Sequence, residues 1–377
     1  MKKIALISHD NTLTGAPIWL AEAAEGLLET DFPIEIHFGL PRPGPLLNRY
    51  SLTEAKGFFF QPEEGDGRHS LLRRRQRRRL ERYIAAEEIE GMVANTLESF
   101  RAVEACARFR IPVIWMVHEM LDSYRERKEF RKIKRAAAAA DRLIFNSQTS
   151  LSRLHLLGKG LEEKASFIYN GIHIPPENEL DKNYRAALGL AEEDILLGAV
   201  GDLAPVKGYD VLLEAFASLS RSDSRIRLII VGRRPRQFRE YQGELERTAR
   251  ERGIADRILF AGEKEKIHPW LSAFDILIHP SRIESFGRVV VEALARGRPV
   301  VAVRSEGVEE IDGGEGVILF AERDDPASEQ FASESRHQLA QFLLKRGDAD
   351  AAMELLGEVD LQNEGLEANQ MLVLYQK

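Results

Sequence analysis

The sequence predicts an α/β protein with two doubly wound domains, each built on a parallel sheet. Short apolar runs alternate with helical stretches, which is the pattern of parallel strands joined by crossover helices. Two prolines at 175–176 interrupt this alternation, which then restarts and continues to about residue 320. We therefore expect domains at residues 1–175 and 176–325, followed by a helical extension at 326–377.

The first expected domain has short apolar strands, as parallel strands buried on both faces do. These strands are expected at residues 3–8, 34–38, 91–95, 113–116, 143–145 and 166–169. Helices are expected between them at 18–28, 69–87, 97–109, 123–140 and 150–157. Each pair of strands is separated by a crossover, so we expect a parallel sheet.

The second expected domain opens with a short helix at 180–188. Its strands are expected at residues 196–200, 227–231, 258–260, 276–279, 300–303 and 317–319. Beyond about residue 325 the pattern is helical only, with a turn at Gly347–Asp348 that resembles one tetratricopeptide unit. Two interpretations of this extension stay open: a terminal cap packed across both domains, and a repeat module.

Composition limits the class of protein. The chain of 377 residues is long enough for two domains with full cores, and its 44% hydrophobic and 30% charged residues are typical of soluble proteins. No run approaches the roughly 18 apolar residues of a membrane span. Only residues 4–7 are apolar after Lys2 and Lys3, so we expect a first strand here and no signal peptide. Cys106 is the single cysteine, which favours a reducing cytoplasm.

The net charge of −7 is unevenly distributed. Residues 1–178 carry 27 basic against 24 acidic side chains, and the remainder carries 26 against 36. Two basic stretches, at 68–83 and 124–135, lie in the first half, and the former has six arginines between Arg73 and Arg79. They indicate either solvated helix faces or peripheral docking to an anionic membrane surface or acceptor. Nucleic acid is not an expected partner, because no aromatic platform or zinc motif accompanies them.

The stretch His279–Ala302 predicts a phosphate site. The strand at 276–279 stops at Pro280, and a helix at 286–296 is expected to begin after Ser285 as N-cap and to end at Gly297. A helix that opens from the carboxyl end of a parallel strand presents free N–H groups and the positive end of its dipole. Glu284 and Glu292 flank this point, and carboxylates accept hydrogen bonds from sugar hydroxyls. The unit therefore indicates a nucleotide sugar.

This stretch resembles the donor motif of glycosyltransferase family 4, retaining enzymes with the GT-B fold of two Rossmann-like domains facing across a cleft. The family pattern is roughly PS-x-x-E-G-F-G-x-x-x-x-E-A-x-A-x-G-x-P-V-V, and Ser285 replaces one glycine. The resemblance implies that Glu284 binds hydroxyls of the transferred sugar. It further implies that the backbone of Ser285, Phe286 and Gly287 holds the diphosphate, and that Glu292 binds the ribose.

A second stretch, Val200–Phe216, resembles the family pattern G-R-L-x-x-x-K-G-x-x-x-L-L-x-A-F. The resemblance implies that Lys207 neutralises the donor diphosphate. Asp202 stands where the family has an arginine, which puts the usual pair of cations in doubt. Arg233 and Arg288 are the expected substitutes; equally, Asp202 indicates a weak or altered enzyme.

Three further positions resemble the family. Gly15 matches part of a Gly-Gly pattern in the first strand–helix loop, with Thr14 in place of the other glycine. His118 follows a strand, where family members often have a histidine that contacts the donor sugar. Gly262 lies where the backbone would approach the base. The competing interpretation of each is an ordinary structural role.

The resemblance implies a retaining hexosyltransferase of polysaccharide biosynthesis that moves a sugar from a nucleoside-diphosphate sugar, with UDP expected, to a hydroxyl of a glycan or lipid-linked acceptor. The nucleotide sugar is a substrate, and neither a cofactor nor a metal is expected. We expect it in the cytoplasm, with peripheral contact at the inner membrane face. The alternatives are another GT-B reaction such as epimerisation, and a non-catalytic nucleotide-sugar-binding or protein-interaction module.

Overall fold

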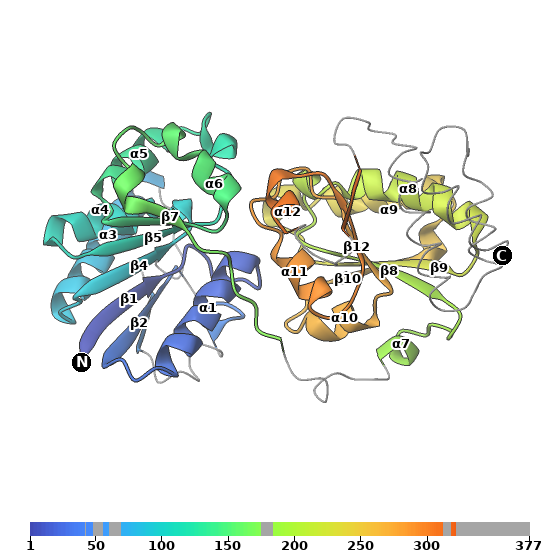
Figure 1. The fold of residues 1–377 in the computed structure, drawn as a ribbon, viewed down its shortest axis with the longest axis horizontal. Coiled ribbons are helices and arrows are strands. Elements are labelled where there is room, and N and C mark those ends of the chain that lie inside the picture. The colour runs from blue at the N-terminus through green and yellow to red at the C-terminus, as the bar shows by residue number, and fades with distance from the viewer. Residues whose placement is uncertain (42, 48–55, 60–68, 175–183, 312–317, 322–377) are drawn as a thin grey trace, which may run out of the picture. The chain divides into compact units, whose positions relative to one another are not determined.

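The computed structural model describes residues 1–41, 43–47, 56–59, 69–174, 184–311 and 318–321. These form two compact units (Figure 1). The first consists of residues 1–174, 283–291 and 306–313, and the second of residues 175–282, 292–305 and 314–377. The predicted helical extension at 326–377 lies outside the described residues, and the predicted domain boundaries stay predictions.

The first sheet has seven parallel strands in the order β3-β2-β1-β4-β5-β6-β7. The strands are β1 (Lys2–Ile7), β2 (Ile34–Leu40), β3 (Lys56–Phe59), β4 (Gly91–Asn95), β5 (Val113–Val117), β6 (Arg142–Phe145) and β7 (Ala165–Phe167). The order reverses direction between β1 and β4, and ligands of open α/β sheets bind outside the carboxyl ends of the strands at such a point.

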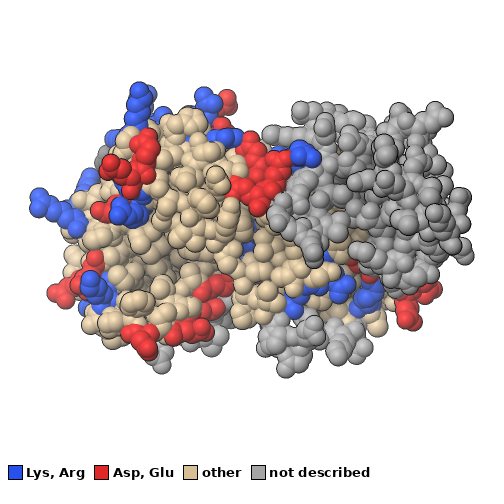
Figure 2. Space-filling view, viewed as in Figure 1, with Lys and Arg blue, Asp and Glu red and all other residues tan. Residues whose placement is uncertain are grey.

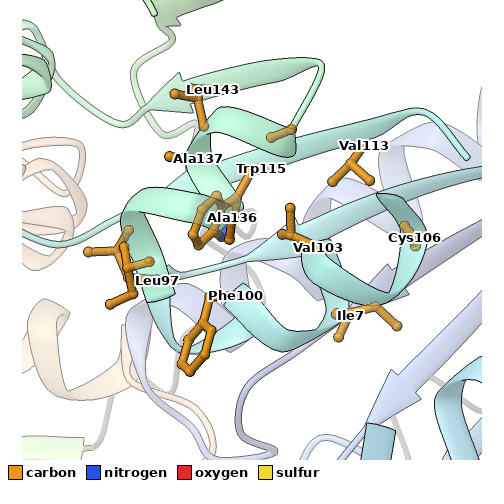
Figure 3. Packing of buried hydrophobic residues seen from close by; sticks show 14 of the residues in the cluster. Ile7, Leu97, Phe100, Val103, Cys106, Val113, Trp115, Ala136, Ala137 and Leu143 are labelled. Carbon is orange, nitrogen blue, oxygen red and sulfur yellow. The ribbon is translucent and has the colours of Figure 1, made fainter. Parts of the chain in front are cut away.

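Helices cover both faces of this sheet, so the middle of β1 is apolar on both of its faces. Ala5 and Ile7 pack with α4 and α5 in one core, and Leu6 packs with α1 in another. Figure 3 shows the core that contains Ile7, Trp115 and Phe100. The helices are α1 (Gly15–Leu28), α3 (His69–Ala86), α4 (Phe100–Phe109), α5 (Phe130–Ala139) and α6 (Gln148–Ser152), with 3-10 turns η1 (Leu97–Ser99), η2 (Leu121–Tyr124), η3 (Leu154–Leu156) and η4 (Glu162–Lys164).

The second sheet has six parallel strands in the order β10-β9-β8-β11-β12-β13. The chain adds strands in one direction from β8 to β10 and in the other direction from β11 to β13, so the order of the strands reverses between β8 and β11. The strands are β8 (Ile195–Val200), β9 (Ile226–Val231), β10 (Ile258–Gly262), β11 (Ile276–His279), β12 (Val300–Val303) and β13 (Ile318–Ala321). The helices in this part of the chain are α7 (Tyr184–Ala187), α8 (Tyr209–Ser222), α9 (Tyr241–Glu251), α10 (His268–Ala273), α11 (Arg288–Leu294) and α12 (Glu306–Glu309), with 3-10 turns η6 (Pro205–Lys207), η7 (Arg236–Phe238) and η8 (Ala255–Arg257). Helix α12 and the first half of α11 belong to the first unit. Phe216 of α8 and Leu245 of α9 cover one face of the sheet in a single core.

The predicted α/β fold with two parallel sheets is confirmed, and several elements differ in their bounds; the helix predicted at 123–140, for example, is α5 alone, from Phe130 to Ala139. Strand β3 was not predicted, because it is a four-residue edge strand that contains Gly57. Helix α1 begins at Gly15, earlier than the predicted start at residue 18. Helix α11 begins at Arg288, so the prediction of Ser285 as its N-cap is wrong.

The end of α11 agrees with the sequence. The N–H of Gly297 donates to the carbonyl of Leu294 at 2.8 Å, and that of Arg298 donates to Ala293 at 3.0 Å. Gly297 has φ +65°, so this is the glycine-terminated pair of hydrogen bonds that commonly ends a helix. The turn directs the chain into β12.

Candidate functional site

His118 lies directly after β5, at the carboxyl edge of the first sheet. The residue is 9% exposed, and its ring centroid lies 5.1 Å from that of Trp19 on α1. Its Nε2 has no hydrogen-bond partner among the described residues. Burial, reinforced by the proximity of His9 and Arg288, lowers the pKa of His118 to about 3. The imidazole is therefore neutral near pH 7, with a buried ring nitrogen able to meet a hydroxyl group.

Glu119 follows His118 and was missed by sequence reasoning. Both its carboxylate oxygens accept the N–H of Leu97 at 3.1 Å, and Oε2 also accepts the N–H of His118 at 3.1 Å. Burial raises the pKa of Glu119 to about 7; the backbone hydrogen bonds oppose this shift and Glu98 adds to it. Adjacency to His118 at a strand end was the only signal in the sequence.

Asn95 and Thr96 lie at the carboxyl end of β4, beside β5. The Asn95 amide donates to the carbonyl of Ala16 at 2.9 Å, which ties β4 to the first turn of α1. Asn95 Oδ1 and Thr96 Oγ1 are buried and have no partner among the described residues. Thr96 has φ 71° and ψ 160°, a conformation that is otherwise almost restricted to glycine. Strained residues of this kind cluster at functional sites, and this one was not foreseen.

Gly15 is the first residue of α1 and is exposed. A Cβ there would lie 3.9 Å from Cδ of Arg288, an ordinary van der Waals distance. The protein itself therefore does not require glycine at this position.

Ser285 belongs to the first unit, and its hydroxyl donates to the carbonyl of His118 at 2.5 Å. The Asn146 side chain donates to Ser285 Oγ at 3.1 Å. This hydrogen bonding replaces the predicted N-cap role, because the helix starts only after Gly287. Gly287 has φ +80°, and a Cβ there would lie 3.2 Å from a methyl group of Val308. Both conditions favour glycine.

The neighbours of Ser285 have defined partners in the same unit. Phe286 is buried and stacks on Tyr169, with ring centroids 5.9 Å apart. Arg288 forms an ion pair with Glu22 of α1 at 2.6 Å, with both side chains largely buried. Arg288 was predicted as a substitute cation, and the structure places a carboxylate against it.

Asp202 and Arg233 pair in the second unit, after β8 and β9 respectively. Arg233 Nε and Nη2 donate to the two Asp202 oxygens at 3.2 and 2.7 Å. The Leu203 N–H also donates to the carbonyl of Arg233 at 2.8 Å. The pair as a whole carries no net charge, so Arg233 does not replace the expected second cation without first leaving Asp202.

Lys207 is half-buried at the end of η6 and precedes Gly208. A Cβ on Gly201 would lie 3.6 Å from Cδ and Cε of Lys207, so the lysine stem runs beside the carboxyl end of β8. Gly208 has φ +69°, and a Cβ there would lie 2.0 Å from the carbonyl oxygen of Pro280. The close approach of two backbones in this turn thus requires glycine.

Arg282 forms hydrogen bonds to both sides of the turn that contains Lys207 and Gly208. Its guanidinium donates to both Asp210 oxygens at 2.9 and 2.7 Å and to the carbonyl of Pro205 at 2.6 Å. Burial raises the pKa of Asp210, but the Arg282 hydrogen bonds outweigh it and the pKa is lowered overall. This brace is a long-range pair that sequence reasoning did not identify.

The remaining predicted residues occupy separate places. Glu284 is half-buried in the first unit, and Glu292 is buried on α11 in the second. Gly262 ends β10 with φ +71°, and its carbonyl accepts the N–H of Gly232 at 3.0 Å. Among the described residues, no group of three His, Cys, Asp or Glu side chains is placed to hold a metal ion.

Two family models match the chain in succession. The one described as Glycosyltransferase Family 4 matches residues 14–174, and the one described as Glycosyl transferases group 1 matches residues 194–341. Their order matches the order of the two sheets. Together they span most of both units.

Curated relatives include the putative glycosyltransferase EpsF of Bacillus subtilis, 29% identical over 190 residues, which are 50% of this chain and 46% of that protein. D-inositol 3-phosphate glycosyltransferase 2 of Catenulispora acidiphila is 34% identical over 217 residues, covering 54% of this chain and 50% of that protein. The chain thus spans about half the length of the curated relatives it matches.

Solved structures match over the whole chain. Alr3699/HepE of Anabaena in complex with UDP and glucose has a TM-score of 0.76 and 22% identity, covering 100% of this chain and 99% of that chain. WaaG, a glycosyltransferase involved in lipopolysaccharide biosynthesis, has a TM-score of 0.67 and 16% identity, covering 98% and 99%. At these identities the likeness shows a shared fold, which is GT-B.

Proposed function

Because the chain belongs to glycosyltransferase family 4, we propose that it transfers a sugar from a nucleoside-diphosphate sugar, with UDP as the nucleotide, to a hydroxyl of a glycan or lipid-linked acceptor. The observation that carries this proposal is His118, whose buried neutral ring has an Nε2 without a hydrogen-bond partner among the described residues, at the carboxyl edge of the first sheet. The HepE structures, which contain UDP, glucose or UDP-glucose, support UDP as the nucleotide.

Lys207 is the cation that we assign to the donor diphosphate. Its stem lies beside the carboxyl end of β8, next to the point where the second sheet reverses direction. The neighbouring Asp202–Arg233 pair carries no net charge, so it adds nothing to the positive charge of Lys207. A fixed cation stabilises the negative charge that develops on a leaving diphosphate.

The other contacts follow from chemistry and position. His118 hydrogen-bonds a hydroxyl of the transferred sugar, and Glu284 accepts hydrogen bonds from its other hydroxyls. Glu292 accepts from the ribose, and the backbone at Gly262 approaches the base. The small Gly15 leaves space for a ligand at the start of α1, where backbone N–H groups are free.

We propose a retaining, same-face reaction without a metal ion. The bond between the sugar anomeric carbon and the diphosphate oxygen breaks as the bond to the acceptor oxygen forms on the same face. The acceptor proton passes to the departing diphosphate oxygen. Lys207 and backbone N–H groups offset the charge on the leaving group.

A panel of UDP-, GDP- and ADP-sugars, scored by thermal shift and by mass spectrometry of products, tests this function. We expect a UDP-sugar to raise the melting temperature and to be consumed only when an acceptor is present. Glu284→Ala should abolish transfer, whereas Glu193→Ala, an exposed glutamate, should not. Full turnover by Glu284→Ala would refute the site, and formation of an epimer or a sugar phosphate would indicate another GT-B reaction.

The Asp202–Arg233 pair favours a second candidate, a binding module that holds a nucleotide sugar without transferring it. Because Asp202 neutralises Arg233, less positive charge is present to stabilise the negative charge on the leaving diphosphate. The same panel separates the two functions. A thermal shift without any product, over all acceptors, would favour the binding module.

We further propose peripheral contact between α5 and an anionic membrane surface. Arg131, Lys132 and Lys134 of α5 are exposed, whereas Arg127 and Arg135 pair with acidic side chains. Figure 2 shows basic and acidic side chains side by side on the first unit. No helix in the described part of the chain is long and apolar enough to span a membrane. Sedimentation with phosphatidylglycerol vesicles should be salt-sensitive and should weaken when these three residues are changed to glutamine.

A further inference from the structure

We infer that Glu119 is a positioning residue for His118, which it holds by accepting the His118 backbone N–H while anchoring the neighbouring turn at Leu97. This inference rests on the proposed contact of His118 with the donor sugar. It adds a residue that acts through His118 and does not itself touch the substrate.

The geometry shows one carboxylate bridging two strand ends. Leu97 follows β4, and His118 follows β5, and these strands are neighbours in the sheet. Glu119 accepts both backbone N–H groups at 3.1 Å, over a sequence separation of 22 residues for Leu97. A shared acceptor couples the two loops, so neither backbone moves without breaking a charge-assisted hydrogen bond.

The anchored turn is also the strained one. Thr96 precedes Leu97 and has φ 71°. Its N–H donates to the carbonyl of Met116 at 2.9 Å, and its own carbonyl accepts Trp115 Nε1 at 2.7 Å. With the Leu97 N–H held by Glu119, the Thr96 backbone is fixed on both sides. Such conformations persist only when the surroundings determine them, and Glu119 supplies one of these restraints.

The ionised carboxylate is the form that fits this environment. Its neighbours are donors: two backbone N–H groups and the Tyr124 hydroxyl, which lies 3.5 Å from Oε1 and also donates to Glu98. Both carboxylate oxygens accept here, and a protonated carboxyl group keeps only its carbonyl oxygen as a good acceptor, so it loses part of this hydrogen bonding. Burial nevertheless favours protonation, and the pKa of Glu119 rises to about 7. The hold on His118 should therefore weaken as the pH falls below about 7.

Other groups around Glu119 do not account for such a titration. The pKa of His118 is lowered to about 3, so its ring stays neutral between pH 5 and 9. In the part of the chain that the structure describes, the charged or titratable side chains that face Glu119 are Glu98 of η1, Tyr124 of η2, Arg127, which pairs with Glu98, and His118, beyond which lie His9 and Arg288. Burial raises the pKa of Tyr124 far above this range.

The first test reads the hydrogen bond without any need for turnover. The full chain with ¹⁵N-histidine has nine histidines, and the His118 amide signal is assigned by its loss in His118→Asn. We expect this amide to titrate with a midpoint near pH 7 in the native protein and to be flat in Glu119→Gln. A flat signal in the native protein, or the same titration in Glu119→Gln, would overturn the inference.

The second test measures transfer against pH. In the native protein kcat should fall on the acid side with an apparent pKa near 7. In Glu119→Gln this dependence should disappear, and kcat at pH 8 should drop about 10- to 100-fold with KM little changed, as expected for a misplaced group. Glu119→Asp should restore part of kcat. Glu104→Gln, which removes an equivalent charge from α4, should behave as the native protein.

An unchanged pH profile in Glu119→Gln, beside an intact His118 titration in the native protein, would overturn the positioning role alone. Absence of donor binding and of transfer in the native protein would instead refute the proposed function. The two failures are therefore distinguishable.

Discussion

Asp202 and Arg233 form a two-bond ion pair at the carboxyl ends of the neighbouring strands β8 and β9, with nitrogen–oxygen distances of 3.2 and 2.7 Å. A cation at the position of Asp202 would add to the charge of Lys207. This carboxylate instead pairs with a nearby guanidinium, and so lowers the net positive charge at the carboxyl ends of these strands.

Removal of the acidic partner and removal of the basic partner should have opposite effects on the affinity for UDP. Asp202→Ala frees the Arg233 charge and should tighten binding about fivefold, since a partly exposed charge interaction is worth roughly 1 kcal/mol. Arg233→Ala leaves Asp202 uncompensated and should weaken binding by a similar factor. Isothermal titration with UDP measures both.

The matched control for this pair is Asp223→Ala. Asp223 pairs with Arg225 in the same unit but precedes β9, at the opposite edge of the sheet. The variant Asp223→Ala should leave the affinity for UDP unchanged. A shift in the same direction for both Asp202→Ala and Arg233→Ala would contradict an electrostatic role of the pair.

Gly208→Ala should displace the turn that holds Lys207. A Cβ there would lie 2.0 Å from the Pro280 carbonyl oxygen, which cannot move without shifting the loop after β11. We expect a lower melting temperature and UDP affinity reduced by at least about tenfold. Gly253 has the same φ of +69° with nothing within 4 Å, so Gly253→Ala should cost only about 1–2 kcal/mol of stability. The affinity of Gly253→Ala for UDP should equal that of the native protein.

Burial of neutral His118 should make stability depend on pH. Its pKa is lowered to about 3 in the folded chain, below the ordinary value of 6.5, so this residue's contribution is present above pH 6.5 and declines as the pH falls. The loss should reach about 1.4 kcal/mol per pH unit below 6.5. His118→Gln should therefore lose less melting temperature between pH 7 and 5 than the native protein does. An equal loss in both would show that His118 is not buried in its neutral form.

Glu119 should have the reverse dependence. Its pKa is raised to about 7 from 4.5, so its contribution is complete below pH 4.5 and is lost as the pH rises through 7. As the pH falls from 7.5 to 5.5, protonation of Glu119 should stabilise the native protein. Glu119→Gln cannot gain this stability, so the melting temperature of the variant should fall more on acidification than that of the native protein. Glu104→Gln is again the control, and identical profiles for all three proteins would contradict a raised pKa.

The fold was predictable because hydrophobic pattern and chain alternation determine it locally. Strand β3 escaped because four residues with a central glycine carry little pattern. The start of α11 was misplaced because Gly287 takes a positive φ, which delays the helix past Ser285. Both misses reflect backbone geometry that residue types indicate only weakly.

The candidate site was predictable only in its motif residues. Lys207 and Glu284 could be named because they stand in recognisable patterns, and His118 because a strand ends there. Glu119 acts through Leu97, 22 residues away, and Arg282 reaches back to Asp210 over 72 residues. Such pairs arise when the chain folds, and nothing in the sequence connects their members.

Lys207 is the cation that we propose recognises the donor diphosphate. Titration of the native protein and Lys207→Ala with UDP and with uridine tests this proposal most directly. We predict that UDP binds the native protein at least about 100-fold more tightly than uridine, and that Lys207→Ala reduces this ratio about tenfold or more while leaving uridine affinity unchanged. An unchanged ratio in Lys207→Ala, or no UDP binding by the native protein, would contradict diphosphate recognition by Lys207.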